Sequence, residues 1–282
     1  DVVLFDMQDI GVRYYTYIST LALVMEVVAE MEVQIWILDR INPLGRGVLG
    51  PILEKEFTSF VGMHSIPIRH GMTIGELAQM INGEGWLVNG IQAELTVISY
   101  SGQIDENIKK NAFNPAPSPN MLDLETAWLY QGLCLLEGTN LSEGRGTDSP
   151  FKLFGAPWLD NQLIANHLQK YSSPGDKYEI TSFTPQSMSA ARYPKYKGEE
   201  CKGIRIIQLN NPLIWTLHLL QIVYDQHPEE FRFLESNFID NLYGSDKFRI
   251  SITTDGEINQ IFDNFQSDEE TFLFKRDNYL IY

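Results

Sequence analysis

The sequence predicts an α/β fold in which a parallel sheet carries helices on both faces. Residues 2–5 form a short β-branched and aromatic run, which is typical of a buried parallel strand. Residues 17–31 offer apolar side chains along a helix, and residues 33–38 form a second apolar run. A strand, a helix and a strand in this order predict a right-handed crossover, which brings both strand ends to one edge of a sheet.

Seven polar residues directly follow these two strands: Asp6, Gln8, Asp9, Arg13, Asp39, Arg40 and Asn42. Open α/β sheets bind ligands in the crevice at the carboxyl ends of their strands, so we expect these side chains to share one binding edge. No GxGxxG pattern follows the first strand, and the fingerprint of a dinucleotide site is therefore missing.

The next elements are a turn, a helix and a strand. Residues 67–71 place His70 on a turn that is expected to face the crevice, although a lone histidine is as often structural. Residues 73–82 predict a short helix, because Thr73 and Glu76 have the spacing of a capping box. We prefer this capping role for Glu76 over a catalytic one. Residues 95–99 predict a further strand.

The stretch 137–151 mixes charges of both signs with three glycines. Such a backbone bends tightly, so we expect four of its side chains to converge on a polar ligand: Glu137, Asn140, Glu143 and Arg145. An ordinary surface loop is the alternative interpretation. The proline-rich segment 114–120 has the composition of a domain linker, but it ends at Asn120 and leads directly into the helix before this stretch. We therefore expect it to be a stiff brace for this site.

The chain after residue 150 predicts a smaller C-terminal α/β or α+β lobe. Its expected helices lie near residues 160–170, 212–224 and 228–236, and its expected strands near 178–183 and 204–208. The predicted domains are therefore residues 1–150 and 151–282.

Composition excludes several classes of partner and site. The chain has 21 basic and 37 acidic residues and a net charge of −16, which argues against nucleic acid and anionic membranes as partners. Two cysteines are too few for a disulfide framework, and the five histidines form no metal-ligand pattern, so no metal and no cofactor are expected. No run of eighteen apolar residues predicts a transmembrane helix.

The loops offer carboxylates beside arginines. Paired carboxylates suit glycoside hydrolysis, with one as the acid and the other as the base or nucleophile, whereas arginines bind a ligand carboxylate or phosphate. Structural pairing among these charges is the competing interpretation for each residue. A serine nucleophile at Ser142 or Ser149 is disfavoured, because neither lies in a GxSxG elbow.

Several longer motifs carry a resemblance to a known family. They occupy residues 5–17 (FDMQDIGVRYYTY), 38–43 (LDRINP), 59–62 (SFVG), 69–78 (RHGMTIGELA), 117–120 (PSPN) and 137–147. In this order they resemble the exo-β-N-acetylmuramidase family of NamZ-like proteins, also catalogued as DUF1343, and the resemblance extends to the closing residues 276–282.

The resemblance implies a hydrolase that removes N-acetylmuramic acid from the non-reducing end of peptidoglycan fragments. It also implies a Rossmann-like domain, a smaller lobe and an active-site cleft between them. In the family a segment of roughly a hundred residues with a candidate catalytic Glu precedes the first strand, and this segment is expected to be absent here. The substrate implies a periplasmic, cell-surface or secreted protein.

The site residues of this hypothesis fall into two groups. Glu143 and Glu137 are expected to be the acid and base, supported by Asp9. The expected substrate-binding residues are Asp6, Gln8, Arg13, Asp39, Arg40, Asn42, His70, Asn120, Asn140 and Arg145. The rival hypotheses are a non-catalytic muropeptide or cell-wall sugar-binding protein and, less favoured, a Rossmann-like protein that binds a nucleotide or sugar phosphate.

Overall fold

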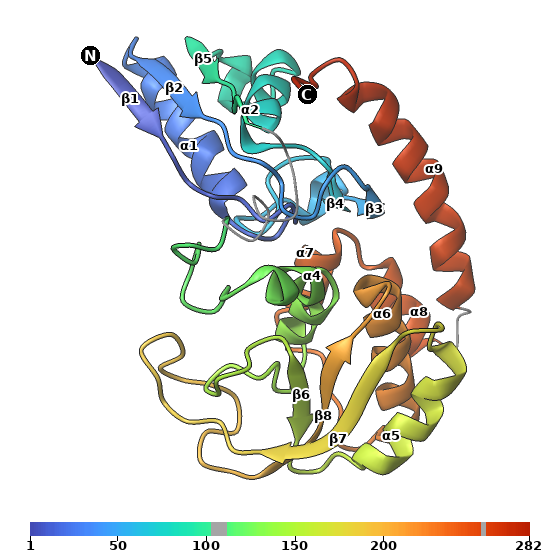
Figure 1. Ribbon diagram of the computed structural model, residues 1–282. Coiled ribbons are helices and arrows are strands. Elements are labelled where there is room, and N and C mark those ends of the chain that lie inside the picture. Colours follow the sequence, from blue (N-terminus) through green and yellow to red (C-terminus); the bar gives the residue numbers. More distant parts are fainter. Residues whose placement is uncertain (103–111, 255–257) are drawn as a thin grey trace. The chain divides into compact units, whose positions relative to one another are not determined.

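The computed structural model describes residues 1–102, 112–254 and 258–282, drawn in Figure 1. These residues form two compact units of similar length, residues 1–117 with 262–282, and residues 118–261. The boundary predicted after residue 150 falls inside the second unit. The reason is local pairing, since Ser142 and Gly155 exchange backbone hydrogen bonds of 2.8 and 3.1 Å across that position.

The first unit contains a parallel sheet, as predicted. Its strand order is β1-β2-β5, and Leu4 lies beside Trp36, which lies beside Thr96. The elements of this unit are β1 (Val2–Phe5), α1 (Tyr17–Glu30), β2 (Gln34–Leu38), β3 (Leu49–Ile52), η1 (Lys55–Phe57), β4 (Pro67–Arg69), α2 (Ile74–Gly83), η2 (Val88–Gly90), β5 (Leu95–Ile98) and most of α9 (Ile258–Arg276).

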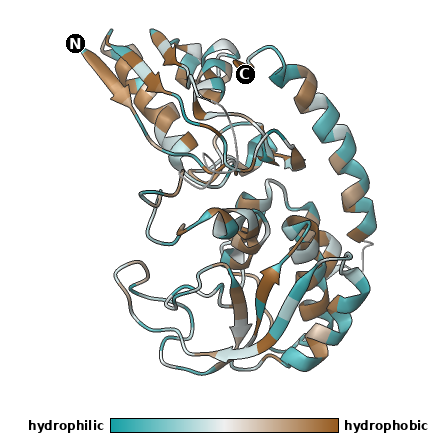
Figure 2. Cartoon of the chain, viewed as in Figure 1, coloured by the Kyte–Doolittle hydropathy of each residue, from teal (hydrophilic) through white to brown (hydrophobic). Residues whose placement is uncertain are grey.

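One face of this sheet is buried and the other is exposed. Phe5, Ile35 and Ile37 belong to a hydrophobic core that is completed by side chains of α1 and α2. On the opposite face Leu4 is 58% exposed and Trp36 38% exposed, and Figure 2 shows β1 in brown, the hydrophobic end of its scale. Helices on both faces were predicted, but within the described residues α1 and α2 pack on the same face.

The end of the chain closes the first unit. The Arg276 guanidinium donates to the Arg46 carbonyl oxygen over 2.8 Å, and the Ile281 amide donates to the Glu76 carboxylate over 2.9 Å. Glu76 also forms the predicted capping box with Thr73 at the start of α2. The sequence motifs did not predict that residues 276–282 pack against the first unit, because these contacts join residues more than two hundred positions apart.

The second unit is α+β and holds an antiparallel sheet of order β6-β8-β7. Its elements are α4 (Leu124–Leu133), η3 (Cys134–Gly138), β6 (Leu153–Ala156), α5 (Asn161–Leu168), η4 (Gln169–Tyr171), β7 (Lys177–Phe183), β8 (Cys201–Gln208), α6 (Pro212–Gln226), α7 (Phe238–Tyr243) and α8 (Lys247–Thr253).

The helix predicted at residues 228–236 is wrong. Residues 228–230 and 235–236 form turns, and the residues between them pair with the segment after α4. The backbone amide of Asn140 donates to the Arg232 carbonyl oxygen, and that of Leu234 donates to the Gly138 carbonyl oxygen, both over 3.0 Å. Phe233 forms an antiparallel bridge with Thr139. None of the helices in the described ranges combines the length and the apolarity needed to cross a bilayer.

Candidate active site

Four charged side chains of the second unit form a cluster that we call the carboxylate cluster: Glu137, Glu143, Arg145 and Lys195. Glu137 lies in η3, and its carboxylate accepts a hydrogen bond from Arg145. The Nε atom of Arg145 lies 3.7 Å from an oxygen of Glu143, so one guanidinium serves both carboxylates. The guanidinium also lies over the Phe151 ring, 5.4 Å from its centroid.

The glycine-rich sequence fixes the loop that carries this cluster. Gly144 and Gly146 adopt φ values of +80° and +82°, which L side chains rarely adopt. A Cβ atom on Gly146 would lie 2.7 Å from the Gln186 carbonyl oxygen. The Gln186 amide in turn donates to the Gly146 carbonyl oxygen over 2.7 Å. The loop therefore packs closely against the β7–β8 connection, residues 184–200.

Lys195, in that connection, completes the cluster. Its ammonium group donates to the backbone carbonyl oxygens of Leu136 and Leu141, both over 2.8 Å, and to the Glu143 carboxylate over 3.0 Å. A cavity of about 370 Å³ opens beside the cluster and is lined by Glu137, Glu143, Arg145 and residues 190–195. This volume falls at the lower end of the range of small-molecule sites, roughly 300–1,000 Å³.

The two carboxyl groups differ in surroundings. Burial raises the pKa of Glu137 above its ordinary value; the Arg145 guanidinium lowers it and the charge of Glu143 raises it. Glu143 is more deeply buried and lies between the cations of Lys195 and Arg145. The pair therefore consists of Glu137, whose pKa is raised, and Glu143, which lies next to a cation on two sides.

The two asparagines predicted to bind the substrate support loops. Asn120 donates to the Ala190 carbonyl oxygen over 2.9 Å, in the segment that lines the cavity, which agrees with the bracing role expected for segment 114–120. The Asn140 side chain donates to the Glu230 carbonyl oxygen and accepts from the Arg232 amide. Its amide group is therefore occupied by protein contacts.

In the first unit, Asp6, Gln8 and Arg40 come together at the carboxyl edge of the sheet. Arg40 forms an ion pair of 2.6 Å with Asp6, and the Gln8 side chain donates to the Ile41 carbonyl oxygen over 3.0 Å. All three line a cavity of about 230 Å³, together with Tyr17 and residues 114–117. Both charges of this group already have a protein partner.

Asp9, Arg13 and His70 are buried in the first unit. The Arg13 guanidinium donates to the carbonyl oxygens of Pro51 and Ile66 over 2.9 and 2.7 Å. Nδ1 of His70 accepts from the Met72 amide, and its Nε2 lies 3.4 Å from the Asp9 carboxylate. These contacts hold the three side chains inside the first unit, where none is more than 4% exposed.

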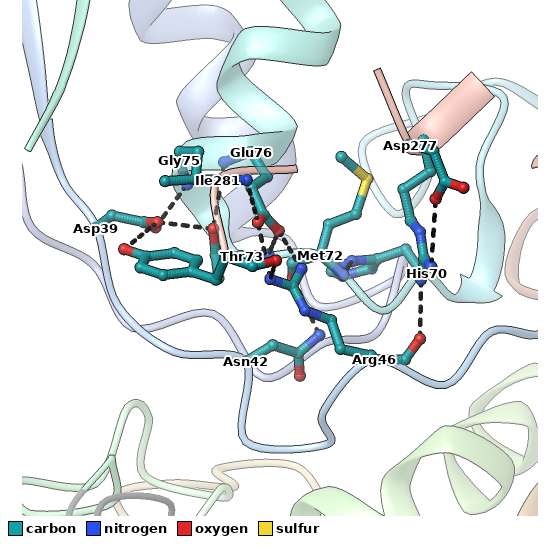
Figure 3. Close-up of polar contacts among 12 residues, drawn as sticks. Asp39, Asn42, Arg46, His70, Met72, Thr73, Gly75, Glu76, Asp277 and Ile281 are labelled. Atoms are coloured by element: carbon teal, nitrogen blue, oxygen red, sulfur yellow. Dashed lines mark hydrogen bonds and ion pairs between the residues drawn. The ribbon is translucent and has the colours of Figure 1, made fainter. Parts of the chain in front are cut away.

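Asp39 and Asn42 are also held by protein contacts, which Figure 3 shows. The Asp39 carboxylate accepts from the Thr73 hydroxyl and the Gly75 amide, each over 2.7 Å, and from the Tyr282 hydroxyl over 3.1 Å. Burial raises the pKa of Asp39. Asn42 donates to the Met72 carbonyl oxygen. At this part of the sheet edge, Asp39 therefore contacts Tyr282 from the C-terminal segment of the first unit.

All six cavity residues from 190 to 195 were absent from the predicted set, and three of them carry a charge or an aromatic ring: Arg192, Tyr193 and Lys195. They lie in the β7–β8 connection, and the length of this loop could have pointed to it, because loops of more than about 12–15 residues are usually functional or disordered. No group of three or more side chains suited to a metal ion gathers within the described ranges.

Comparisons with known proteins cover the whole chain. Residues 1–125 match the family described as "Exo-beta-N-acetylmuramidase NamZ, N-terminal", and residues 128–282 match its C-terminal counterpart. The peptidoglycan beta-N-acetylmuramidase NamZ of Bacillus subtilis (strain 168) is 37% identical over 290 residues, which span 100% of this chain and 67% of that protein.

Two crystal structures of DUF1343 family proteins from Bacteroides fragilis NCTC 9343 have a similar fold. They match with TM-scores of 0.82 and 0.85 at 34% and 26% identity. Each match covers 100% of this chain and 75% of the other. From these two family matches and the Bacillus relative it follows that the chain belongs to the exo-beta-N-acetylmuramidase NamZ family.

Proposed function

We propose that this chain is a glycoside hydrolase that releases N-acetylmuramic acid from the non-reducing end of peptidoglycan fragments. The observation that carries the proposal for the site is the carboxylate cluster, in which Glu137 and Glu143 share the Arg145 guanidinium beside a cavity of about 370 Å³. Family membership supports the reaction and the class of substrate.

The surroundings of the two carboxyl groups suggest their roles. Glu137, with its raised pKa, is the proton donor to the glycosidic oxygen, and the bond from that oxygen to the anomeric carbon breaks. Glu143 faces the positive charge that develops on the sugar and either attacks it or activates a water molecule. If Glu143 attacks, a glycosyl ester forms on it, and water then cleaves this ester while giving its proton to Glu137. If Glu143 activates the water, it takes the water's proton and passes it to solvent, and Glu137 regains a proton from solvent. In both routes the hydroxyl of the water ends on the anomeric carbon of the released N-acetylmuramic acid.

Arg192 is the cation we assign to the lactyl carboxylate of N-acetylmuramic acid. Arg145 and Lys195 are both engaged by carboxylates of the cluster. Arg192 is exposed, lines the same cavity and has no ion-pair partner for its guanidinium within the described part of the chain. Arginine pairs well with a carboxylate, because its planar group donates two parallel hydrogen bonds.

The reaction is tested with two disaccharides that differ in the order of their sugars. We expect release of free N-acetylmuramic acid from MurNAc–GlcNAc and none from GlcNAc–MurNAc, measured by liquid chromatography with mass detection. Saturable binding of MurNAc–GlcNAc without release would instead favour the non-catalytic muropeptide-binding protein. Absence of both binding and release would contradict the proposal.

The role of Arg192 has a separate test by calorimetry with two monosaccharide ligands. Arg192→Gln is expected to weaken the binding of N-acetylmuramic acid about tenfold, which corresponds to about 1.4 kcal/mol. Its binding of the lactyl methyl ester, which carries no charge, stays as in the unchanged protein. Equal losses for both ligands would contradict a contact to the carboxylate.

The substrate also leads us to propose a periplasmic, cell-surface or secreted location. Peptidoglycan lies outside the cytoplasmic membrane, so an enzyme that acts on its fragments finds substrate there. Fractionation of cells that produce the full-length protein tests this, and recovery in the cytoplasmic fraction alone would contradict it.

A further inference from the structure

Tyr193 projects an exposed aromatic ring at the mouth of the cavity in the second unit. The residue is 93% exposed, although it lines the same cavity as the buried Glu143. No ring contact involves Tyr193 within the described ranges, whereas Tyr171, another exposed tyrosine of this unit, stacks on His218 at 4.1 Å. Packing therefore does not explain the position of the Tyr193 ring.

The loop beneath Tyr193 is held in place on both sides. Met188 and Ala191 exchange two backbone hydrogen bonds of 3.0 Å, and the Ser187 hydroxyl donates to the Arg192 carbonyl oxygen over 2.6 Å. The ammonium group of Lys195 fixes the following turn through its three contacts. A ring carried on a braced loop loses little conformational freedom when a ligand binds, so its contact area contributes more to affinity.

Side-chain exposure increases from the carboxylates to this ring. The Glu143 side chain is 6% exposed, that of Glu137 is 20% exposed and that of Arg145 is 35% exposed. A sugar whose glycosidic bond meets the two carboxylates therefore occupies the inner part of the cavity. The cavity has room for a ligand of monosaccharide size, so the next sugar lies at the mouth, where Tyr193 is.

We propose that Tyr193 stacks on the sugar on the leaving side of the scissile bond, so that the site binds a disaccharide unit. This inference rests on the proposed function and names a specificity-determining residue for it. A tyrosine ring offers a flat apolar face to the C–H groups of a pyranose, and its hydroxyl remains in water. The neutral N-acetylglucosamine residue of a muropeptide has such a face and carries no charge that would need an ion pair.

The test separates affinity for one sugar from affinity for two. Binding is measured by calorimetry in the Glu143→Gln background, so that the disaccharide is not consumed, with and without Tyr193→Ala. We expect the loss of the ring to weaken MurNAc–GlcNAc binding about tenfold, or about 1.4 kcal/mol, and N-acetylmuramic acid binding less than about twofold. Tyr193→Phe is expected to restore disaccharide binding, because it keeps the stacking face.

Phe274→Ala is the matched control, since Phe274 is 85% exposed in the first unit and lines neither cavity described above. It is expected to change neither affinity. Equal losses for both ligands on Tyr193→Ala, or no loss for the disaccharide, would overturn the inference. If the unchanged protein binds and cleaves MurNAc–GlcNAc, either result counts against the stacking role alone. If it neither binds nor cleaves it, the proposed function itself has failed.

Discussion

Replacing Lys195 by methionine removes the ammonium group that joins the carboxylate cluster to two buried carbonyl groups. The change keeps most of the side-chain length, so the lost contacts are the hydrogen bonds to the Leu136 and Leu141 oxygens and the ion pair with Glu143. Leu136 and Leu141 are completely buried, and Glu143 nearly so. Water has little access to any of the three partners.

The magnitude follows from those partners. A buried polar group left without a hydrogen bond costs about 1–3 kcal/mol, and a buried ion pair that loses one member costs about 3–5 kcal/mol. These costs are not additive, and the Lys195 side chain is itself 26% exposed, so water replaces part of what is lost. We therefore expect the free energy of unfolding to fall by about 2–4 kcal/mol.

Lys152→Met provides a matched control in the same unit. Lys152 also pairs with two acidic groups, at 2.9 and 2.6 Å, but Asp123 and Glu125 are 50% and 59% exposed. Exposed pairs contribute about 0–1 kcal/mol, so this variant is expected to lose no more than that. Urea unfolding followed by circular dichroism measures both variants. Equal losses in the two, or a loss below about 1 kcal/mol for Lys195→Met, would refute the reasoning.

Three further predictions concern protonation, backbone strain and the exposed sheet face. Glu137 can donate a proton only while it is protonated, so activity is expected to fall as the pH rises through its pKa. Because the Arg145 guanidinium lowers that pKa, Arg145→Gln is expected to move the alkaline limb of the pH–rate profile to higher pH. A limb that stays in place would exclude Glu137 as the donor. Gly146→Ala forces a side chain into φ +82° and close contact with Gln186, so urea unfolding should show a loss of about 1–3 kcal/mol. Leu4→Ser on the exposed sheet face should lower the fluorescence of a bound hydrophobic dye and change the free energy of unfolding by less than about 0.5 kcal/mol. A loss of about 2–5 kcal/mol, as for a leucine in a hydrophobic core, would mean that this side chain is buried.

Local sequence signals predicted the first half of the fold well. The apolar runs around residues 2–5 and 33–38 led to β1 and β2, and the spacing of Thr73 and Glu76 led to the capping box of α2. These features depend on neighbours along the chain, and short-range rules capture them. The helix prediction for residues 228–236 was wrong for the opposite reason. This segment pairs with Gly138 and Asn140, which lie more than ninety residues earlier in the chain.

The candidate site was predictable only where its residues are close in sequence. Glu137, Glu143 and Arg145 share one loop, and their convergence followed from its glycines and charges. Lys195 lies 52 positions from Glu143, so only the folded β7–β8 connection brings it there. Residue type alone also does not separate a ligand contact from a hydrogen bond within the fold, and this is why Arg13 and Asp39 were expected to bind substrate.

The most direct test of the central claim measures the release of N-acetylmuramic acid from MurNAc–GlcNAc by three forms of the chain. Glu143→Gln is expected to lower the rate by about 10²–10⁴-fold, the usual contribution of a catalytic acid or base. Glu125→Gln, which alters an exposed carboxylate at the start of α4, is expected to leave the rate unchanged. Release by Glu143→Gln at the rate of the unchanged protein would contradict the assignment of the carboxylate cluster as the active site.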